Sequence, residues 1–169
     1  MEHPVLDINY FPYSKEMDPR KSGKACLQMI CDFYGSATRK VKFLNDKIKG
    51  GKGITLLDVK LVADKIGFKT FCTAIDMEKL FNAPLPSIVH WYSVRFIVVY
   101  QIIGNKVYIC DPTDNHGKII SKSTFLEGFT KEVAMNSKEN PDQYKKANLD
   151  STKKPGIVLL FEPSPLIFT

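Results

Sequence analysis

The sequence predicts an α+β fold, in which helices of the N-terminal half pack on a mostly antiparallel sheet formed later in the chain. Two apolar runs at helical spacing, one after Ser22 and one after Thr55, predict the helices. Three strand-like runs follow one another at 87–91, 95–103 and 106–110 and predict the sheet. The order of these runs, helices before strands, gives the fold class.

The central helix is predicted over residues 23–34. Its apolar residues recur at helical spacing and are Cys26, Leu27, Met29, Ile30, Phe33 and Tyr34. Ser22 is a natural N-cap, because its hydroxyl can accept a hydrogen bond from a free backbone N–H of the first turn. Gly35 follows the aromatic pair and is a natural C′ residue, so we expect the helix to end there.

A lead-in and two further helices complete the predicted N-terminal half. Residues 1–10 form the lead-in, and the segment from Arg39 to Lys49 is expected to form a weaker helix before a glycine-rich turn. Thr55 and Asp58 have the spacing of a capping box, which predicts that the third helix begins at Thr55. Gly67 is expected to end it.

The C-terminal half is expected to contain short strands and helices. Besides the three strands above, these are a strand at 69–75, a short helix from Met77 to Asn82, a helix from Ser121 to Phe129 and a strand at 157–161. Gly104-Asn105 predicts a hairpin turn between two of the strands. Residues 131–154 are polar and lysine-rich and are expected to form a surface insertion in a single domain that spans 1–169.

Composition limits the classes of protein that the chain can belong to. With 169 residues and 44% hydrophobic content, it can bury one sizeable core without disulfides. Its four cysteines, Cys26, Cys31, Cys72 and Cys110, show no paired spacing, so we expect reduced core residues and neither zinc nor another metal. The net charge of +6 is spread over many lysines and indicates a solvated surface, not a nucleic-acid site. No secretory signal or membrane-spanning run is visible.

Motifs along nearly the whole chain resemble one family. In chain order they are Phe11-Pro12-Tyr13, Ala25 to Ile30, Phe33-Tyr34-Gly35, Gly53 to Leu56, Ile66-Gly67-Phe68, Leu85 to Trp91, Phe96 to Val99, Asp111-Pro112 and Gly156 to Pro163. They resemble the papain-like cysteine peptidase domain of bacteriocin-exporting ABC transporters, which cuts double-glycine leader peptides. The resemblance implies a papain-like fold and an active-site slot between helices and sheet. It also implies that the exporter's membrane and ATPase domains are not present in this chain.

The catalytic positions implied by the resemblance hold different residues here. In register, Ser22 occupies the nucleophilic Cys position and Arg95 the His position, while Glu16 falls at the Gln position of the oxyanion hole. The orienting Asp is retained as Asp111. An engineered Cys→Ser knockout would explain Ser22 alone, but it would not explain the other two positions.

These replacements remove the chemistry of a papain-like site. The first turn of a buried helix favours a thiolate, but a serine hydroxyl without a base is a far weaker nucleophile. Arg95 stays protonated and has no acceptor lone pair, so it cannot act as a base. A carboxylate at Glu16 would oppose an oxyanion. We therefore expect Arg95 to form a charge-assisted pair with Asp111.

Neighbouring residues allow an alternative catalytic pair and a possible cleft wall. A Cys26–His90 dyad could replace the lost pair, although Cys26 is expected to point into the core. Trp91 and Tyr92 are either core residues or a wall of the substrate cleft.

The preferred function is a non-catalytic, peptidase-like domain that needs no cofactor. The resemblance implies that it would bind a leader peptide or export substrate at the inner, cytoplasmic face of the cell membrane, as part of an exporter. The alternatives are an active leader peptidase that cleaves after a double glycine and a stand-alone regulatory domain.

Overall fold

A computed structural model describes residues 11–35, 53–130 and 154–162 of the chain. The predicted lead-in at 1–10, the predicted helix from Arg39 to Lys49 and the segment 131–153 of the predicted insertion lie outside the described residues. Across the described ranges, no helix combines the length and the apolar character needed to cross a membrane.

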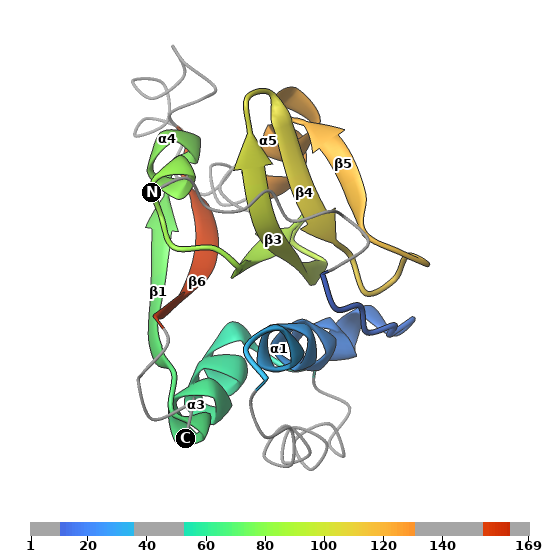
Figure 1. The fold of residues 1–169 in the computed structure, drawn as a ribbon, viewed down its shortest axis with the longest axis vertical. Coiled ribbons are helices and arrows are strands. Elements are labelled where there is room, and N and C mark those ends of the chain that lie inside the picture. Colours follow the sequence, from blue (N-terminus) through green and yellow to red (C-terminus); the bar gives the residue numbers. More distant parts are fainter. Residues whose placement is uncertain (1–10, 36–52, 131–153, 163–169) are drawn as a thin grey trace, which may run out of the picture.

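A six-stranded antiparallel sheet runs through the molecule in the order β1-β6-β2-β3-β4-β5 (Figure 1). The strands are β1 (Lys69–Ile75), β2 (Ser87–Trp91), β3 (Arg95–Ile103), β4 (Lys106–Cys110), β5 (Lys118–Ser121) and β6 (Gly156–Glu162). The mostly antiparallel sheet is therefore confirmed. The last described strand, β6, lies between β1 and β2 and pairs with both.

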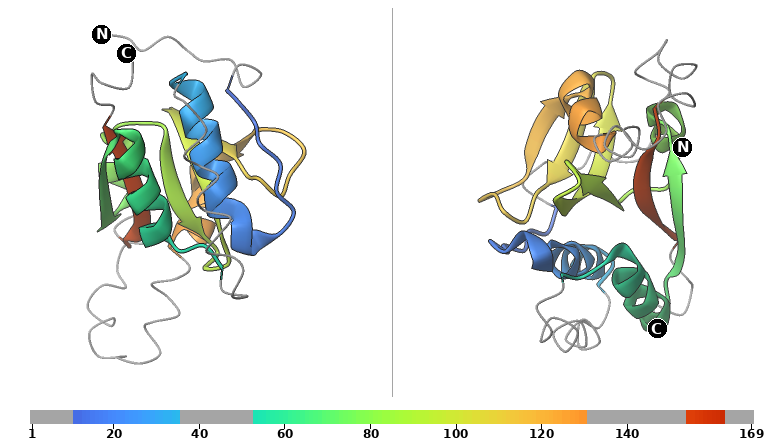
Figure 2. Two further views of the ribbon diagram at one scale, coloured as in Figure 1. Left: turned by 90° about the horizontal axis from the view of Figure 1, so that it is seen from below. Right: turned by 180° about the vertical axis from the view of Figure 1, so that it is seen from behind.

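The helices form a layer on each face of the sheet. They are the 3₁₀ turn η2 (Pro19–Lys21) and the helices α1 (Ser22–Phe33), α3 (Leu56–Ile66), α4 (Met77–Phe81) and α5 (Lys122–Phe129). One core packs α1 and α3 against one face, and a second core packs α4 and α5 against the other. Figure 2 shows α1 and α3 side by side along the sheet.

Successive side chains of the central strand β3 point to opposite faces of the sheet and so contribute to both cores. On β3, Val98 belongs to the core under α1, whereas Ile97 and Val99 belong to the core under α5. The middle part of β3 is therefore buried on both faces. Ile103 departs from it, since 40% of this residue is exposed where the hairpin leaves the core.

Helix ends follow the sequence signals with one exception. Thr55 and Asp58 form the predicted capping box at the start of α3, and Gly67 ends this helix at φ +119°. Gly35 has φ +68° directly after the end of α1, as predicted. The prediction that Ser22 is an N-cap is wrong. The η2 turn runs directly into α1, so Ser22 is already helical and its N–H donates to Pro19 O.

Two further details differ from the prediction. Strand β5 was not predicted, because Lys118–Ser121 has only two apolar residues and neither is fully buried. Cys72 is exposed although a core position was predicted, because β1 is an edge strand with mostly exposed residues. The other three cysteines are buried, and all four are free thiols.

Candidate active site

Ser22, Arg95 and Asp111 meet where the start of α1 approaches one end of the β3–β4 hairpin. The register pairs Val98 with Cys110, so the start of β3 and the residue after β4 lie at the same end of the hairpin. Gly23 allows α1 to approach α3 and β3 closely. A Cβ added at this position would lie 2.9 Å from a methyl group of Val59 and 3.4 Å from the Phe96 ring.

The Ser22 hydroxyl is completely buried and bonded on both sides. It donates to the carbonyl oxygen of Pro19 at 2.7 Å and accepts from the backbone N–H of Phe96 at 2.9 Å. The second bond joins the start of α1 directly to β3. The hydroxyl therefore works as a link between a helix and a strand.

Arg95 and Asp111 form the predicted charge-assisted pair. Nε of Arg95 lies 2.9 Å from Oδ2 and 3.2 Å from Oδ1 of Asp111, and Nη2 lies 2.7 Å from Oδ2. The Asp111 side chain is only 5% exposed and that of Arg95 26%. Two donors of a planar guanidinium on one carboxylate fix both side chains in orientation.

Thr113 completes the surroundings of the Asp111 carboxylate. Its N–H and its hydroxyl both donate to Oδ1, at 3.0 and 2.8 Å. Burial alone would raise the pKa of Asp111, but the hydrogen bonds from Arg95 and Thr113 outweigh it and hold the pKa below its usual value. The carboxylate is therefore ionised at neutral pH and its oxygens are engaged.

Glu16 reaches the same region through its backbone. Its N–H donates to Pro112 O at 2.8 Å, while its carboxylate Oε1 accepts from the N–H of Asp18 at 3.2 Å. The side chain thus bonds the turn that leads into η2. Among the described residues it makes no hydrogen bond or ion pair with Arg95.

A segment before η2 adds contacts that sequence reasoning did not identify. The Tyr13 hydroxyl lies within hydrogen-bond reach of the carbonyl oxygens of Asp111, Pro112 and Asp114. Burial and the charges of Asp114 and Asp111 raise the pKa of Tyr13 to about 12, so it stays a donor. The aromatic motif Phe11-Pro12-Tyr13 was the available signal for these contacts, but nothing in the sequence shows which loop it contacts.

Trp91 and Tyr92 lie at the end of β2. Trp91 is 5% exposed and packs on Phe125 in the core under α5, with ring centroids 5.4 Å apart. Tyr92 is half-buried, and its ring meets Trp91 edge-on. A substrate-binding role for this pair stays a prediction.

The alternative dyad finds little support in the geometry. Cys26 is fully buried on α1, and burial raises its pKa well above the usual value for a thiol. The His90 ring stacks on Phe96 with centroids 4.8 Å apart. Cys26 therefore keeps its proton at neutral pH and packs as an apolar residue.

The contacts of Ser22, Arg95 and Asp111 can hold α1, β3 and the residue after β4 together, and they offer little for acyl transfer. Neither the Ser22 hydroxyl nor the Ser22 N–H is free, because both donate to Pro19 O. Within the part of the chain that the structure describes, no three metal-ligating side chains come together.

Comparison with known proteins agrees with this fold. The family model described as "Peptidase C39 family" matches residues 10–141. The colicin V secretion/processing ATP-binding protein CvaB of Escherichia coli is 25% identical over 129 residues, which are 75% of this chain and 18% of that protein. Like CvaB, the next two curated relatives are far longer, since the chain spans only 14% and 19% of them.

Two solved structures share the fold. A double-glycine-motif protease from an AMS/PCAT transporter, in complex with its leader peptide, has a TM-score of 0.66 at 23% identity and covers 90% of this chain and 91% of its own. The peptidase domain of Streptococcus ComA also has a TM-score of 0.66 at 23% identity, covering 92% and 100%. The papain-like α+β fold is thus confirmed. Since the family model matches well over half of the residues, the chain belongs to the Peptidase C39 family.

Proposed function

We propose that this chain is a non-catalytic member of its family, a domain that binds a leader peptide or export substrate without cutting it. One observation carries the proposal: the hydroxyl at the expected nucleophile position, Ser22, is fully buried and bonded to Pro19 O and Phe96 N. A nucleophile must face the substrate carbonyl and transfer its proton to a base.

The neighbouring groups support the same proposal. Arg95, at the expected base position, cannot accept a proton and is bound to Asp111. The backbone N–H of Ser22, which would serve an oxyanion hole, donates to Pro19 O. At the position where the resemblance implies Gln, Glu16 contributes a carboxylate that accepts a hydrogen bond from the N–H of Asp18.

The relatives support a role in peptide export. CvaB is a secretion and processing ATP-binding protein, and one structural neighbour holds a leader peptide. We propose that the chain acts beside the membrane and ATPase domains of an ABC exporter, at the inner face of the cell membrane. Its ligand would be an amphipathic leader helix or the exported peptide itself.

Family membership also favours one other function, an active peptidase that cleaves after a double glycine. Titration calorimetry and mass spectrometry on one sample separate the two. A binding domain gives a dissociation constant in the micromolar range, roughly −8 kcal/mol, and leaves the leader peptide intact. A peptidase shortens the peptide at the double glycine. Absence of heat with leader peptides encoded by neighbouring genes would contradict the binding role.

A triple variant tests whether the three replacements account for lost catalysis. Ser22→Cys, Arg95→His and Glu16→Gln together restore a thiol, a base and an oxyanion donor at the positions that the resemblance implies. We expect the triple variant to gain leader cleavage that the parent lacks. Ser22→Cys alone is the matched control, and it should stay inactive because Arg95 still holds Asp111.

A further inference from the structure

The guanidinium of Arg95 uses only one of its two edges to bind Asp111. The bonds to the carboxylate come from Nε and Nη2, which form one edge of the planar group. The outer edge is formed by Nη1 and the second N–H of Nη2. Over residues 11–35, 53–130 and 154–162, no hydrogen bond or ion pair engages this outer edge.

The outer edge of Arg95 reaches the solvent and is held in one orientation. The side chain of Arg95 is 26% exposed, and Nη1 is not one of the buried polar atoms that lack a partner. Its partner Asp111 is only 5% exposed and is itself fixed by two hydrogen bonds from Thr113. A donor pair that is already oriented costs a ligand less entropy than a mobile one.

Arg20 shows the same pairing geometry without the burial. Its Nε and Nη2 bond the Asp18 carboxylate at 3.1 and 2.9 Å, but the Arg20 side chain is 60% exposed and that of Asp18 25%. An exposed ion pair competes with water and fixes its side chains only weakly. Of these two arginines, Arg95 is therefore the one with a preorganised outer edge.

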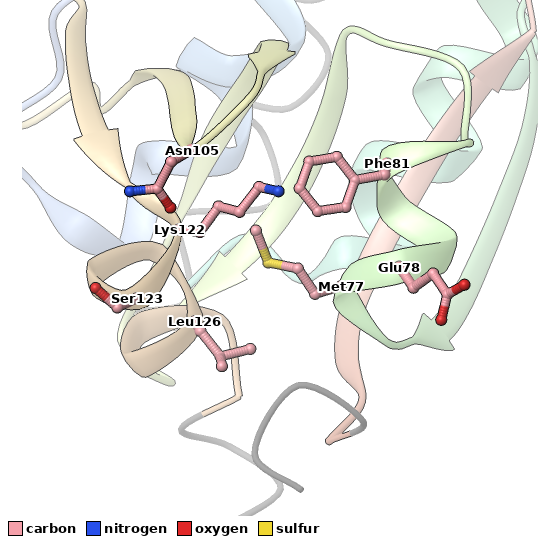
Figure 3. A pocket seen from close by; sticks show the side chains of 7 residues that line it. All are labelled: Met77, Glu78, Phe81, Asn105, Lys122, Ser123 and Leu126. Atoms are coloured by element: carbon pink, nitrogen blue, oxygen red, sulfur yellow. The ribbon is translucent and has the colours of Figure 1, made fainter.

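Lys122 is another cation that an acidic ligand could meet. It lines a recess of about 450 Å³ between α4 and α5 (Figure 3). Its Nζ lies 3.9 Å from the centroid of the Phe81 ring, so the ammonium already has an aromatic partner. An ammonium is also a point charge and lacks the two parallel donors that match a carboxylate. Arg95 is therefore the more specific of the two cations.

We propose that the outer edge of Arg95 binds one carboxylate of the ligand, whose two oxygens face Nη1 and Nη2. This inference rests on the proposed function, because a peptide ligand supplies a carboxylate at its C-terminus or on an acidic side chain. Two parallel N–H···O bonds distinguish a planar carboxylate from a neutral amide. Asp111 repels any second anion on the same guanidinium, so the gain is modest and doubly charged phosphate is disfavoured.

Three small probes test the carboxylate requirement by NMR titration of the whole chain. They are N-acetyl-Gly-Gly with a terminal carboxylate, N-acetyl-Gly-Asp-amide with a side-chain carboxylate, and N-acetyl-Gly-Gly-amide with none. We expect a carboxylate probe to cause saturable shifts of the Arg95 Nε–H and Thr113 amide signals. The amide probe should bind about fivefold more weakly, as for a partly exposed ion pair. The tighter carboxylate probe shows whether the terminus or a side chain supplies the group.

Variants assign the preference to the planar edge of Arg95. Arg95→Lys keeps the positive charge, but its one ammonium must serve both Asp111 and the ligand, so the preference should be lost. Arg20→Lys is the same substitution at the exposed pair and should keep the fivefold preference. The comparison of probes on the parent needs no variant, so it tests the proposal even if Arg95→Lys does not fold.

Four results would overturn the proposal. They are the absence of saturable Arg95 shifts with both carboxylate probes, equal affinity for N-acetyl-Gly-Gly and its amide, shifts at Lys122 instead of Arg95, and tighter binding of phosphate than of either carboxylate at equal ionic strength. Failure of the proposed function gives a different result. A leader peptide would then give no heat in calorimetry, while N-acetyl-Gly-Gly would still shift the Arg95 signal.

Discussion

At the scale of single residues, the polar groups of Ser22 and Arg95 form hydrogen bonds with other residues of the chain. Ser22 bonds Pro19 and Phe96, and Arg95 bonds Asp111. At the positions that the resemblance assigns to the reacting groups, these bonds connect α1, β3 and the residue after β4. Such contacts stabilise a fold, and their strength can be measured.

Arg95→Ala is expected to destabilise the domain by roughly 2–4 kcal/mol. The loss leaves the buried Asp111 carboxylate without its cation, which costs more than breaking an exposed pair, about 0–1 kcal/mol. Urea unfolding measures the change. Arg20→Ala is the matched control, because Arg20 pairs with Asp18 on the exposed η2 turn. Equal effects of the two substitutions would contradict the buried pair.

The same pair predicts a pH dependence. The pKa of Asp111 in the folded protein lies below 3.8, its ordinary value, so its contribution is complete above about pH 5. It is lost as the pH falls through the lower, folded-state pKa. The Asp111→Asn variant has no such group. The difference in unfolding free energy between the parent and this variant should therefore be larger at about pH 7 than at about pH 3. A deficit that does not change between these two conditions would show that ionisation of Asp111 contributes nothing.

At the scale of elements, α5 is held on the sheet by a close contact with Trp91. An added Cβ at Gly128 would lie 2.7 Å from three atoms of the Trp91 ring. Phe125 packs on the same ring from one turn earlier. A residue without a side chain is required where this indole meets the helix.

Gly128→Ala should therefore destabilise the domain, by about 1–3 kcal/mol through overpacking, although alanine favours helices. Fluorescence of the one tryptophan reports the change directly, since the new methyl group displaces its ring. Glu127→Ala, at the exposed neighbouring position of the same helix, should leave both stability and fluorescence unchanged. A stabilised Gly128→Ala variant would contradict the described packing.

The elements with strong local signals could be predicted from the sequence. The capping box at Thr55, the hairpin at Gly104 and the strand around Val98 all depend on near neighbours, and the structure agrees with them. Strand β5 could not be predicted, because its four residues become a strand only by pairing with β4. The position of Ser22 inside the helix depends on the η2 turn before it.

Part of the candidate site could also be predicted, namely the pairing of Arg95 with Asp111. That prediction came from the register of family motifs, since the two residues are separated by a whole hairpin. The bond between Ser22 and Phe96 N and the contacts of Tyr13 depend on how distant segments pack. No pattern in the sequence shows them.

At the scale of the whole molecule, the sheet lies between two apolar cores. One face carries α1 with the contacts of Ser22, Arg95 and Asp111, and the other carries α4 and α5. The family fold has been kept around a site whose polar groups are engaged. This combination agrees with a domain that recognises a peptide and leaves its covalent bonds intact.

Mass spectrometry of a double-glycine leader peptide incubated with the parent chain tests this account most directly. We expect the peptide to keep its full mass over many hours while calorimetry on the same sample reports micromolar binding. Cleavage after the double glycine that disappears in the Ser22→Ala variant would contradict the account, because it would show that the buried hydroxyl of Ser22 is a working nucleophile.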